Sequence, residues 1–129
     1  MIGTHGTTFG GSALACALGH HVLTRVSSRA FISQVKENSE YMIERLKEMV
    51  GKYPEVVERE IRGRGMIVGL GFKKGEHAGE IVRMARERGV LILTAGKDAV
   101  RLVPSLNIGR EEIDETVQVL DHVISLALK

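Results

Sequence analysis

The 129-residue sequence has one cysteine, two prolines, no tryptophan and few other aromatic residues. Because a disulfide needs two cysteines, Cys16 cannot form one within the chain, and a lone thiol favours an intracellular, reducing compartment. No apolar run approaches the roughly 20 residues that a membrane-spanning helix needs. The N-terminus has neither the basic region of a secretory signal nor the Arg/Ser-rich character of a transit peptide. We therefore expect no membrane partner, and we expect any targeting signal to lie outside this sequence.

The sequence also lacks a charge bias. Its 18 basic and 16 acidic residues are spread along the chain and give a net charge of +2. A nucleic-acid surface would need a basic patch or stripe, so we expect no nucleic-acid partner. Hydrophobic residues make up 43% and charged residues 26%, which is typical of a globular domain and not of a disordered segment. The length leaves room for one domain.

The N-terminal part combines a loop of small residues with helical patterns. Residues 3–11 (GTHGTTFGG) are too rich in glycine and threonine for a helix and predict a shaped loop. Ser12 offers a hydroxyl N-cap for a first helix, and Ser27-Ser28 marks a break before a second helix, which ends near Gly51. The apolar residues at helical spacing are Leu14, Leu18, Val22 and Val26, and then Phe31, Val35, Met42, Leu46 and Met49.

From residue 55 the spacing changes to the alternation of strands. Val57, Arg59 and Ile61 alternate with charged neighbours, and a second strand follows the segment RGRG at 62–65. This strand has an apolar face and a face where small residues let something pack closely: Met66, Val68, Leu70 and Phe72 against Ile67, Gly69 and Gly71.

The rest of the pattern is helix, strand, strand, helix. The third helix ends at Gly89, and short strands at 90–94 and 99–103 flank a turn at 96–98. Neighbouring strands with short links favour an antiparallel or mixed sheet covered by helices, and therefore an α+β fold. The apolar helix positions are Ala78, Ile81, Val82 and Ala85, and then Ile113, Val117, Leu120, Val123 and Ile124.

The Gly/Thr loop is a candidate phosphate site. Free amides ahead of a helix N-terminus suit phosphate, and the hydroxyls of Thr7 and Thr8 add donors. His5 would border such a site. On the residues alone, a flexible connector is an equally good interpretation. The loop is not a P-loop, because no Gly-Lys-Ser/Thr follows at the required spacing.

Two other motifs do not support a site. Gly63, Gly65 and Gly69 have GxGxxxG spacing and lead into a strand, whereas a dinucleotide fingerprint opens a helix. His20 and His21 are adjacent, roughly 100° apart on a helix, and lack companion ligands for zinc. We expect no metal site.

Arg101 lies in a short apolar strand just before Pro104. An unpaired buried arginine is costly, so this one must reach solvent or an anion. Its planar fork matches a carboxylate, although a structural salt bridge is the favoured interpretation from the residues alone. No nucleophile with an oriented base emerges, and the seven lysines occupy helix faces, loops or the C-terminus. The chain supplies binding groups and no evident catalyst.

The segment GTHGTTFGGSALACALG resembles the GTHGTTFGGNPLACAVG-type segment of acetylornithine aminotransferases, which are class III, fold-type I pyridoxal-phosphate (PLP) enzymes. The similarity continues through IRGRGMIVGLGF, ARERGVLILTAGKDAVRLVPSLNI and EEIDETVQVLDHVIS, in the same order and over nearly the whole chain. The chain is therefore identified as resembling the C-terminal part of such an enzyme.

The resemblance implies specific roles. Thr8 corresponds to the threonine that donates to the PLP phosphate across a homodimer interface, and Thr7 to the residue that approaches acetylornithine in the neighbouring subunit. Arg101 corresponds to the arginine that pairs with the substrate α-carboxylate. Two departures, Ser12-Ala13 for the usual Asn-Pro and Ser105 for a usual proline, remove none of these contacts. The second is expected to loosen the loop after Arg101.

The resemblance also implies an absence. The Schiff-base lysine, the aspartate at the pyridine nitrogen and the aromatic that stacks on the ring belong to a large domain upstream in the family. We therefore expect no covalently bound PLP and no catalysis by this chain alone. The implied fold has an interface loop and connecting helices at 1–54, followed by a small α+β domain at 55–129 with a 3–4-stranded, mostly antiparallel sheet.

The implied reaction of the parent enzyme is amino transfer from N-acetylornithine to 2-oxoglutarate in arginine biosynthesis, cytoplasmic in bacteria and in the mitochondrial matrix in fungi. Ornithine, succinylornithine and 4-aminobutyrate aminotransferases are alternatives within the class. From another class, a non-catalytic module would self-associate through exposed apolar helix faces. A third alternative is a stand-alone phosphate or nucleotide binder that uses the Gly/Thr loop.

Overall fold

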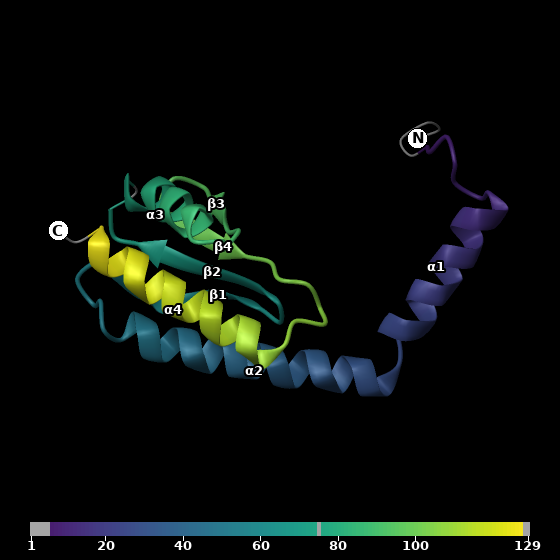
Figure 1. Ribbon diagram of the computed structural model, residues 1–129, viewed down its shortest axis with the longest axis horizontal. Coiled ribbons are helices and arrows are strands. Elements are labelled where there is room, and N and C mark those ends of the chain that lie inside the picture. The colour runs from purple at the N-terminus through teal and green to yellow at the C-terminus, as the bar shows by residue number, and fades with distance from the viewer. Residues whose placement is uncertain (1–5, 75, 128–129) are drawn as a thin grey trace. The chain divides into compact units, whose positions relative to one another are not determined.

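The protein was analysed as a computed structural model that describes residues 6–74 and 76–127. Its contacts divide the chain into two compact units, one ending at Gln34 and the other beginning at Val35. The elements are α1 (Ala13–Val26), α2 (Arg29–Val50), β1 (Val57–Arg64), β2 (Ile67–Phe72), α3 (Glu76–Glu87), β3 (Leu93–Ala95), β4 (Ala99–Leu102) and α4 (Arg110–Leu126) (Figure 1). This order confirms the predicted one, including the α+β class.

The N-terminal unit begins with the predicted loop and capped helix. The Ala15 amide donates to the Ser12 hydroxyl at 3.3 Å, so Ser12 is the N-cap of α1. The break at the serine pair is also confirmed, because α1 ends at Val26 and the Phe31 amide donates to the Ser28 hydroxyl. None of the residues of α1 is buried, and its large exposed hydrophobic residues are Leu14, Leu18, Val22 and Leu23.

The C-terminal unit contains a four-stranded sheet in the order β1-β2-β4-β3, with every pairing antiparallel. The glycine-rich segment closes the β1–β2 hairpin, as its composition predicts. Gly63 has a φ of +115°, and a Cβ there would lie 2.2 Å from the Ile67 carbonyl oxygen. The register of β1 shifts between Val57 and Ile61, and Arg59 is exposed whereas Val57 is buried.

The core lies on one face of this sheet. Met66, Val68, Leu70 and Phe72 are buried there, which confirms the predicted apolar face of β2. The helices add the residues expected from their spacing: Met42, Leu46 and Met49 of α2, Ala78, Ile81 and Ala85 of α3, and Ile113, Val117, Leu120, Val123 and Ile124 of α4. The second half of α2 therefore belongs to the core of this unit. The boundary predicted between residues 54 and 55 separates two parts of the longer enzymes of the family, and it stays a prediction.

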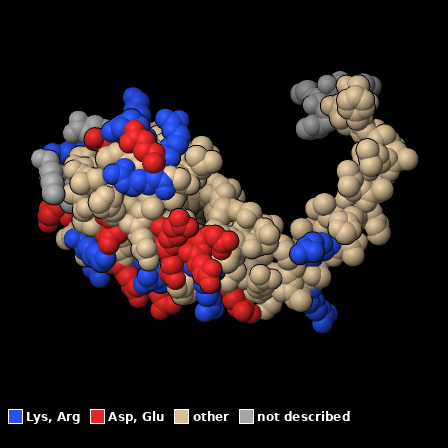
Figure 2. All heavy atoms as spheres, in the orientation of Figure 1, with Lys and Arg blue, Asp and Glu red and all other residues tan. Residues whose placement is uncertain are grey.

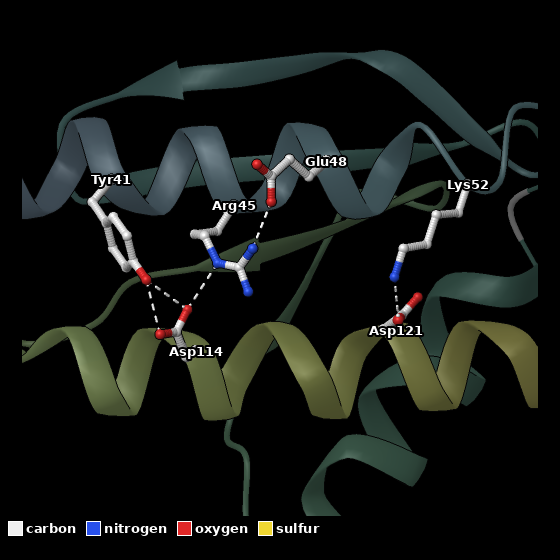
Figure 3. A network of polar contacts seen from close by, with 6 residues as sticks. All are labelled: Tyr41, Arg45, Glu48, Lys52, Asp114 and Asp121. Atoms are coloured by element: carbon white, nitrogen blue, oxygen red, sulfur yellow. Dashed lines mark hydrogen bonds and ion pairs between the residues drawn. The ribbon is translucent and has the colours of Figure 1, made fainter.

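A line of polar contacts, the α2–α4 seam, joins α2 and the residues just after it to α4 (Figure 3). The Tyr41 hydroxyl donates to both carboxylate oxygens of Asp114, at 2.9 and 2.8 Å. The Arg45 Nε donates to the same carboxylate at 2.8 Å, and another nitrogen of Arg45 contacts Glu48 at 2.5 Å. The hydrogen bond from Arg45, and then that from Tyr41, lower the pKa of Asp114 from its ordinary value of 3.8.

Asp121 forms the second part of the seam, seven residues or about two helical turns further along α4. The Lys52 ammonium lies 2.7 Å from one oxygen of Asp121, and the Tyr53 hydroxyl donates to the other oxygen at 2.6 Å. Burial acts to raise the pKa of Asp121, but the two hydrogen bonds outweigh it and lower the pKa. Burial, and then the contact with Asp121, raise the pKa of Tyr53 to about 12.

Among the described residues, none of the helices combines the length and the apolar composition that crossing a bilayer would require.

Candidate functional site

The Gly/Thr loop holds Thr7 and Thr8 in exposed positions, five and four residues before Ser12, the N-cap of α1. A Cβ at Gly10 would lie 2.1 Å from the Thr7 methyl carbon, so glycine is what lets Thr7 fold over the loop. Gly11 has a φ of +80°, and the Ser12 amide donates to the Phe9 carbonyl at 3.2 Å. The segment is therefore a shaped turn, as its composition predicts.

The donors of this loop fit a phosphate group. The hydroxyls of Thr7 and Thr8 make no hydrogen bond with any other residue that the structure describes. The loop leads into the N-terminus of a 14-residue helix, an end at which the backbone dipole favours an anion. The residues up to Lys36 include no aspartate or glutamate, and Figure 2 shows no red atoms around α1. His5, the other candidate in this loop, lies outside the described residues.

Arg101 lies on the sheet face opposite the core. Its neighbours on β4, Val100 and Leu102, are buried, while Arg101 itself is exposed. In the register of the sheet, Arg101 is opposite Gly69 of β2 on one side and Leu93 of β3 on the other. Within the described part of the chain no acid pairs with its guanidinium, so the structural salt bridge considered from the sequence is not formed there.

We call the surface around Arg101 the open face; its members are Ile67, Gly69, Leu93 and Arg101. Ile67 and Leu93 are each 57% exposed, although both are apolar. The open face therefore presents the Arg101 cation among apolar side chains, and Arg64 lies exposed on the same side of the sheet, opposite Ile67. Such a surface matches a ligand that has a carboxylate and an aliphatic part.

The neighbouring part of β2 is covered by a pair from the chain itself. The Arg62 guanidinium and the Glu58 carboxylate form an ion pair. A Cβ at Gly71 would lie 2.2 Å from a Glu58 oxygen and 3.1 Å from an Arg62 nitrogen. The prediction that small residues on this side of β2 allow close packing is confirmed at Gly71, and the group that packs there is the Glu58–Arg62 pair.

The candidate residues fall into two groups. Thr7 and Thr8 lie together in the loop of the N-terminal unit, and Arg101 lies in the C-terminal unit. In the described residues, no three His, Cys, Asp or Glu side chains are grouped as metal ligands.

A cavity of about 310 Å³, which the sequence did not predict, lies between the residues before β3, the loop after β4 and the start of α4. Its apolar lining includes Val90, Ile92 and Val117, and its polar rim includes Glu112 and Thr116. Glu112 accepts from the Gly109 amide at 2.9 Å, and Thr116 donates to the Glu112 carbonyl at 2.7 Å. These polar groups cap and stabilise α4, so the cavity offers mainly an apolar surface. In the sequence, the feature that could have pointed to this cavity is the acidic first turn of α4, which includes Glu112.

Comparison with known proteins identifies the family. The sequence pattern of the family Aminotransferase class-III matches residues 1–124. A mitochondrial acetylornithine aminotransferase of Saccharomyces cerevisiae is 42% identical over 123 residues, which cover 95% of this chain and 28% of the relative. A succinylornithine transaminase of Yersinia enterocolitica is 39% identical over 117 residues, which cover 88% of this chain and 28% of that protein.

A solved structure agrees with these relatives. The crystal structure of N-acetylornithine aminotransferase from Stenotrophomonas maltophilia is similar to this chain with a TM-score of 0.81 and 32% identity. The similarity covers 89% of this chain and 32% of that structure. The chain thus spans less than a third of the length of the curated relatives that it matches.

Proposed function

The chain belongs to the class-III aminotransferases, and from this membership we propose that it is the C-terminal part of a PLP-dependent acetylornithine aminotransferase. The reaction of the whole enzyme is amino transfer from N-acetylornithine to 2-oxoglutarate, which gives N-acetylglutamate semialdehyde and glutamate in arginine biosynthesis. The observation that carries the proposal is the 42% identity to an acetylornithine aminotransferase over 95% of this chain.

In this proposal Thr8 donates its hydroxyl to the PLP phosphate of a neighbouring subunit, and Thr7 approaches the acetylornithine bound there. The support is local, because both residues are exposed, their hydroxyls are unpaired among the described residues, and their loop leads into the N-terminus of α1. The functional unit is accordingly a homodimer that meets at the Gly/Thr loop. When bound, PLP supplies the electron sink that amino transfer requires.

Arg101 binds the substrate α-carboxylate in this proposal. Its guanidinium is exposed on the open face and has no acidic partner among the described residues. A planar guanidinium can donate two parallel hydrogen bonds to a carboxylate, which fixes the orientation of the acid as well as its position.

The rest of the machinery belongs to the large domain of the family. That domain supplies the lysine that binds PLP, the aspartate at the pyridine nitrogen and the stacking aromatic, so the large domain is the partner that this chain needs for catalysis. We expect the 129-residue chain alone not to catalyse the reaction. The compartment follows the organism, with the mitochondrial matrix in fungi and the cytoplasm in bacteria.

Succinylornithine is the second candidate substrate, because a succinylornithine transaminase is 39% identical over 88% of the chain. The two substrates share the ornithine carboxylate and differ in the acyl group. Binding at Arg101 is therefore common to both candidates, and the preference between them depends on the pocket for the acyl group.

A chimera tests the proposal. The C-terminal segment of the Saccharomyces cerevisiae relative is replaced by this chain along the 123 matched residues. We expect a PLP-containing chimera that converts N-acetylornithine and 2-oxoglutarate faster than succinylornithine. A folded, PLP-containing chimera that turns over neither substrate contradicts the proposal, and one that prefers succinylornithine selects the second candidate.

A further inference from the structure

Gly69 lies at the centre of the row that contains Arg101. It is opposite Arg101 in the β2–β4 pairing and opposite Arg62 in the β1–β2 pairing. Directly opposed residues of antiparallel strands place their side chains on the same face. Two arginine stems therefore border a strip of bare backbone at Gly69, which is roughly 10 Å across, or two inter-strand spacings.

The fold itself does not require glycine at this position. The atoms nearest to a Cβ added at Gly69 are the Arg62 Cβ at 3.7 Å and the Arg62 and Val100 carbonyl oxygens at 3.8 Å, which are ordinary van der Waals contacts. Gly69 is also not among the glycines with positive φ. Because glycine inside a strand is less favourable than alanine, stability alone would favour a side chain here.

The other glycines of this hairpin have reasons within the described structure. Gly63 has a positive φ and approaches the Ile67 carbonyl oxygen, and Gly71 makes room for the Glu58–Arg62 pair. Gly69 differs from both, because none of the described residues occupies the space above it closely enough to exclude a Cβ.

We propose that Gly69 determines ligand specificity on the open face by keeping the surface beside Arg101 bare. The aliphatic chain of an unbranched carboxylate then lies flat across β2 while Arg101 holds its carboxylate. This inference rests on the proposed role of Arg101 and adds to it the shape of the ligand. Leu93 and Ile67 supply apolar contacts near the strip, and the charge of Arg62 is already paired with Glu58.

The test uses the whole 129-residue chain with ¹⁵N label and follows the Arg101 side-chain Nε–H resonance. Acetate and pentanoate are the probes, because they share the carboxylate and differ only in the chain that would cover the strip. In the wild type we expect pentanoate to bind roughly threefold or more tightly than acetate, from the added apolar contact. In Gly69→Ala we expect unchanged acetate binding and the loss of the pentanoate advantage.

Gly79→Ala is the matched control, because an added Cβ at Gly79 meets nothing within 4 Å. It should keep the full pentanoate advantage. The melting temperature of Gly69→Ala should equal or exceed that of the wild type. A markedly lower value would show that the fold does require this glycine and would overturn the inference.

The remaining outcomes separate the inference from the proposed function. If neither probe binds the wild type in an Arg101-dependent manner, Arg101 is not a carboxylate ligand, and the inferred role of Gly69 is overturned as well. If both probes bind through Arg101 and Gly69→Ala keeps the pentanoate advantage, the inference is overturned while the role of Arg101 stands.

Discussion

The two faces of the sheet differ in whether their apolar and charged side chains find partners within the described chain. On the covered face, the side chains of β2 and three helices form a continuous buried core. In the α2–α4 seam, Asp114 accepts a hydrogen bond from Arg45 of α2, and Asp121 accepts one from Tyr53, which follows α2. On the open face, Arg101 has no acidic partner among the described residues and Leu93 is 57% exposed. The covered face therefore supplies the core of the fold, and the open face is the one to which we assign ligand binding as a proposal.

The largest effect should come from removing the cation of the open face. In the chimera with the Saccharomyces cerevisiae relative, we expect Arg101→Ala to lower kcat/KM by about 100-fold or more, because a carboxylate loses its charged partner. Arg64→Ala is the control, since Arg64 is exposed on the same side of the sheet but is opposite Ile67. Equal losses in the two variants, measured by steady-state kinetics, would contradict a specific role for Arg101.

The next effect compares leucines on the two faces. Leu120 is 0% exposed in α4, so Leu120→Ala should lower the free energy of unfolding by about 3 kcal/mol, through lost burial and a cavity. Leu93→Ala should cost less than about 0.5 kcal/mol, because Leu93 remains largely in water. Urea denaturation followed by circular dichroism measures both values. A cost for Leu93→Ala as large as that for Leu120→Ala would mean that the open face is part of the folding core.

A smaller effect is expected from the seam. Tyr53→Phe removes the hydroxyl that donates to the Asp121 carboxylate at 2.6 Å and to its carbonyl at 3.0 Å. We expect a loss of about 1 kcal/mol, because Asp121 is partly exposed and water replaces part of the contact. Lys52→Met should cost less, since that ion pair is more exposed. A Tyr53→Phe variant as stable as the wild type in urea would show that the hydroxyl contributes nothing.

The pH dependence of stability should also come from the seam. The pKa of Asp114 and the pKa of Asp121 are lowered in the folded chain, so their contribution is complete above the unfolded value near 3.8 and is lost as the pH falls through the folded values. The pKa of Tyr53 is raised from 10.0 to about 12, so its contribution is complete below pH 10 and is lost as the pH rises toward 12.

Melting temperatures between pH 2 and pH 12 test this expectation. They should form a plateau at neutral pH and fall at both ends. Tyr53→Phe should weaken the alkaline decrease, and Asp121→Asn should weaken the acid decrease. An alkaline decrease that is identical in Tyr53→Phe and the wild type would assign it to other groups.

Local rules predicted the elements of the fold well. The Ser12 cap, the serine break, the hairpin at the RGRG segment and the buried face of β2 follow from hydrogen-bonding side chains, glycine and alternation. The shift of register in β1 did not follow, because alternation fixes the face of a residue only while pairing is regular. The α2–α4 seam was also missed, since Tyr41 and Asp114 are separated by 73 positions in the sequence.

The candidate site was predicted in its residues but not in its surroundings. Spacing and chemistry identified Thr7, Thr8 and Arg101 as potential anion ligands, and the family resemblance gave them roles. That Gly69 and Leu93 flank Arg101 depends on the register of β2, β3 and β4, which sequence periodicity does not fix. The roles of the three residues stay predictions that the experiments above test.

We propose that the open face binds the carboxylate of the substrate, whereas the α2–α4 seam serves only the fold. The most direct test is a backbone amide titration of the ¹⁵N-labelled chain with N-acetylornithine. We predict saturable shifts at Gly69, Leu93 and Arg101, and unshifted amides at Asp114 and Asp121. Shifts confined to the cavity at the start of α4, or an absence of shifts on the open face, would contradict the claim.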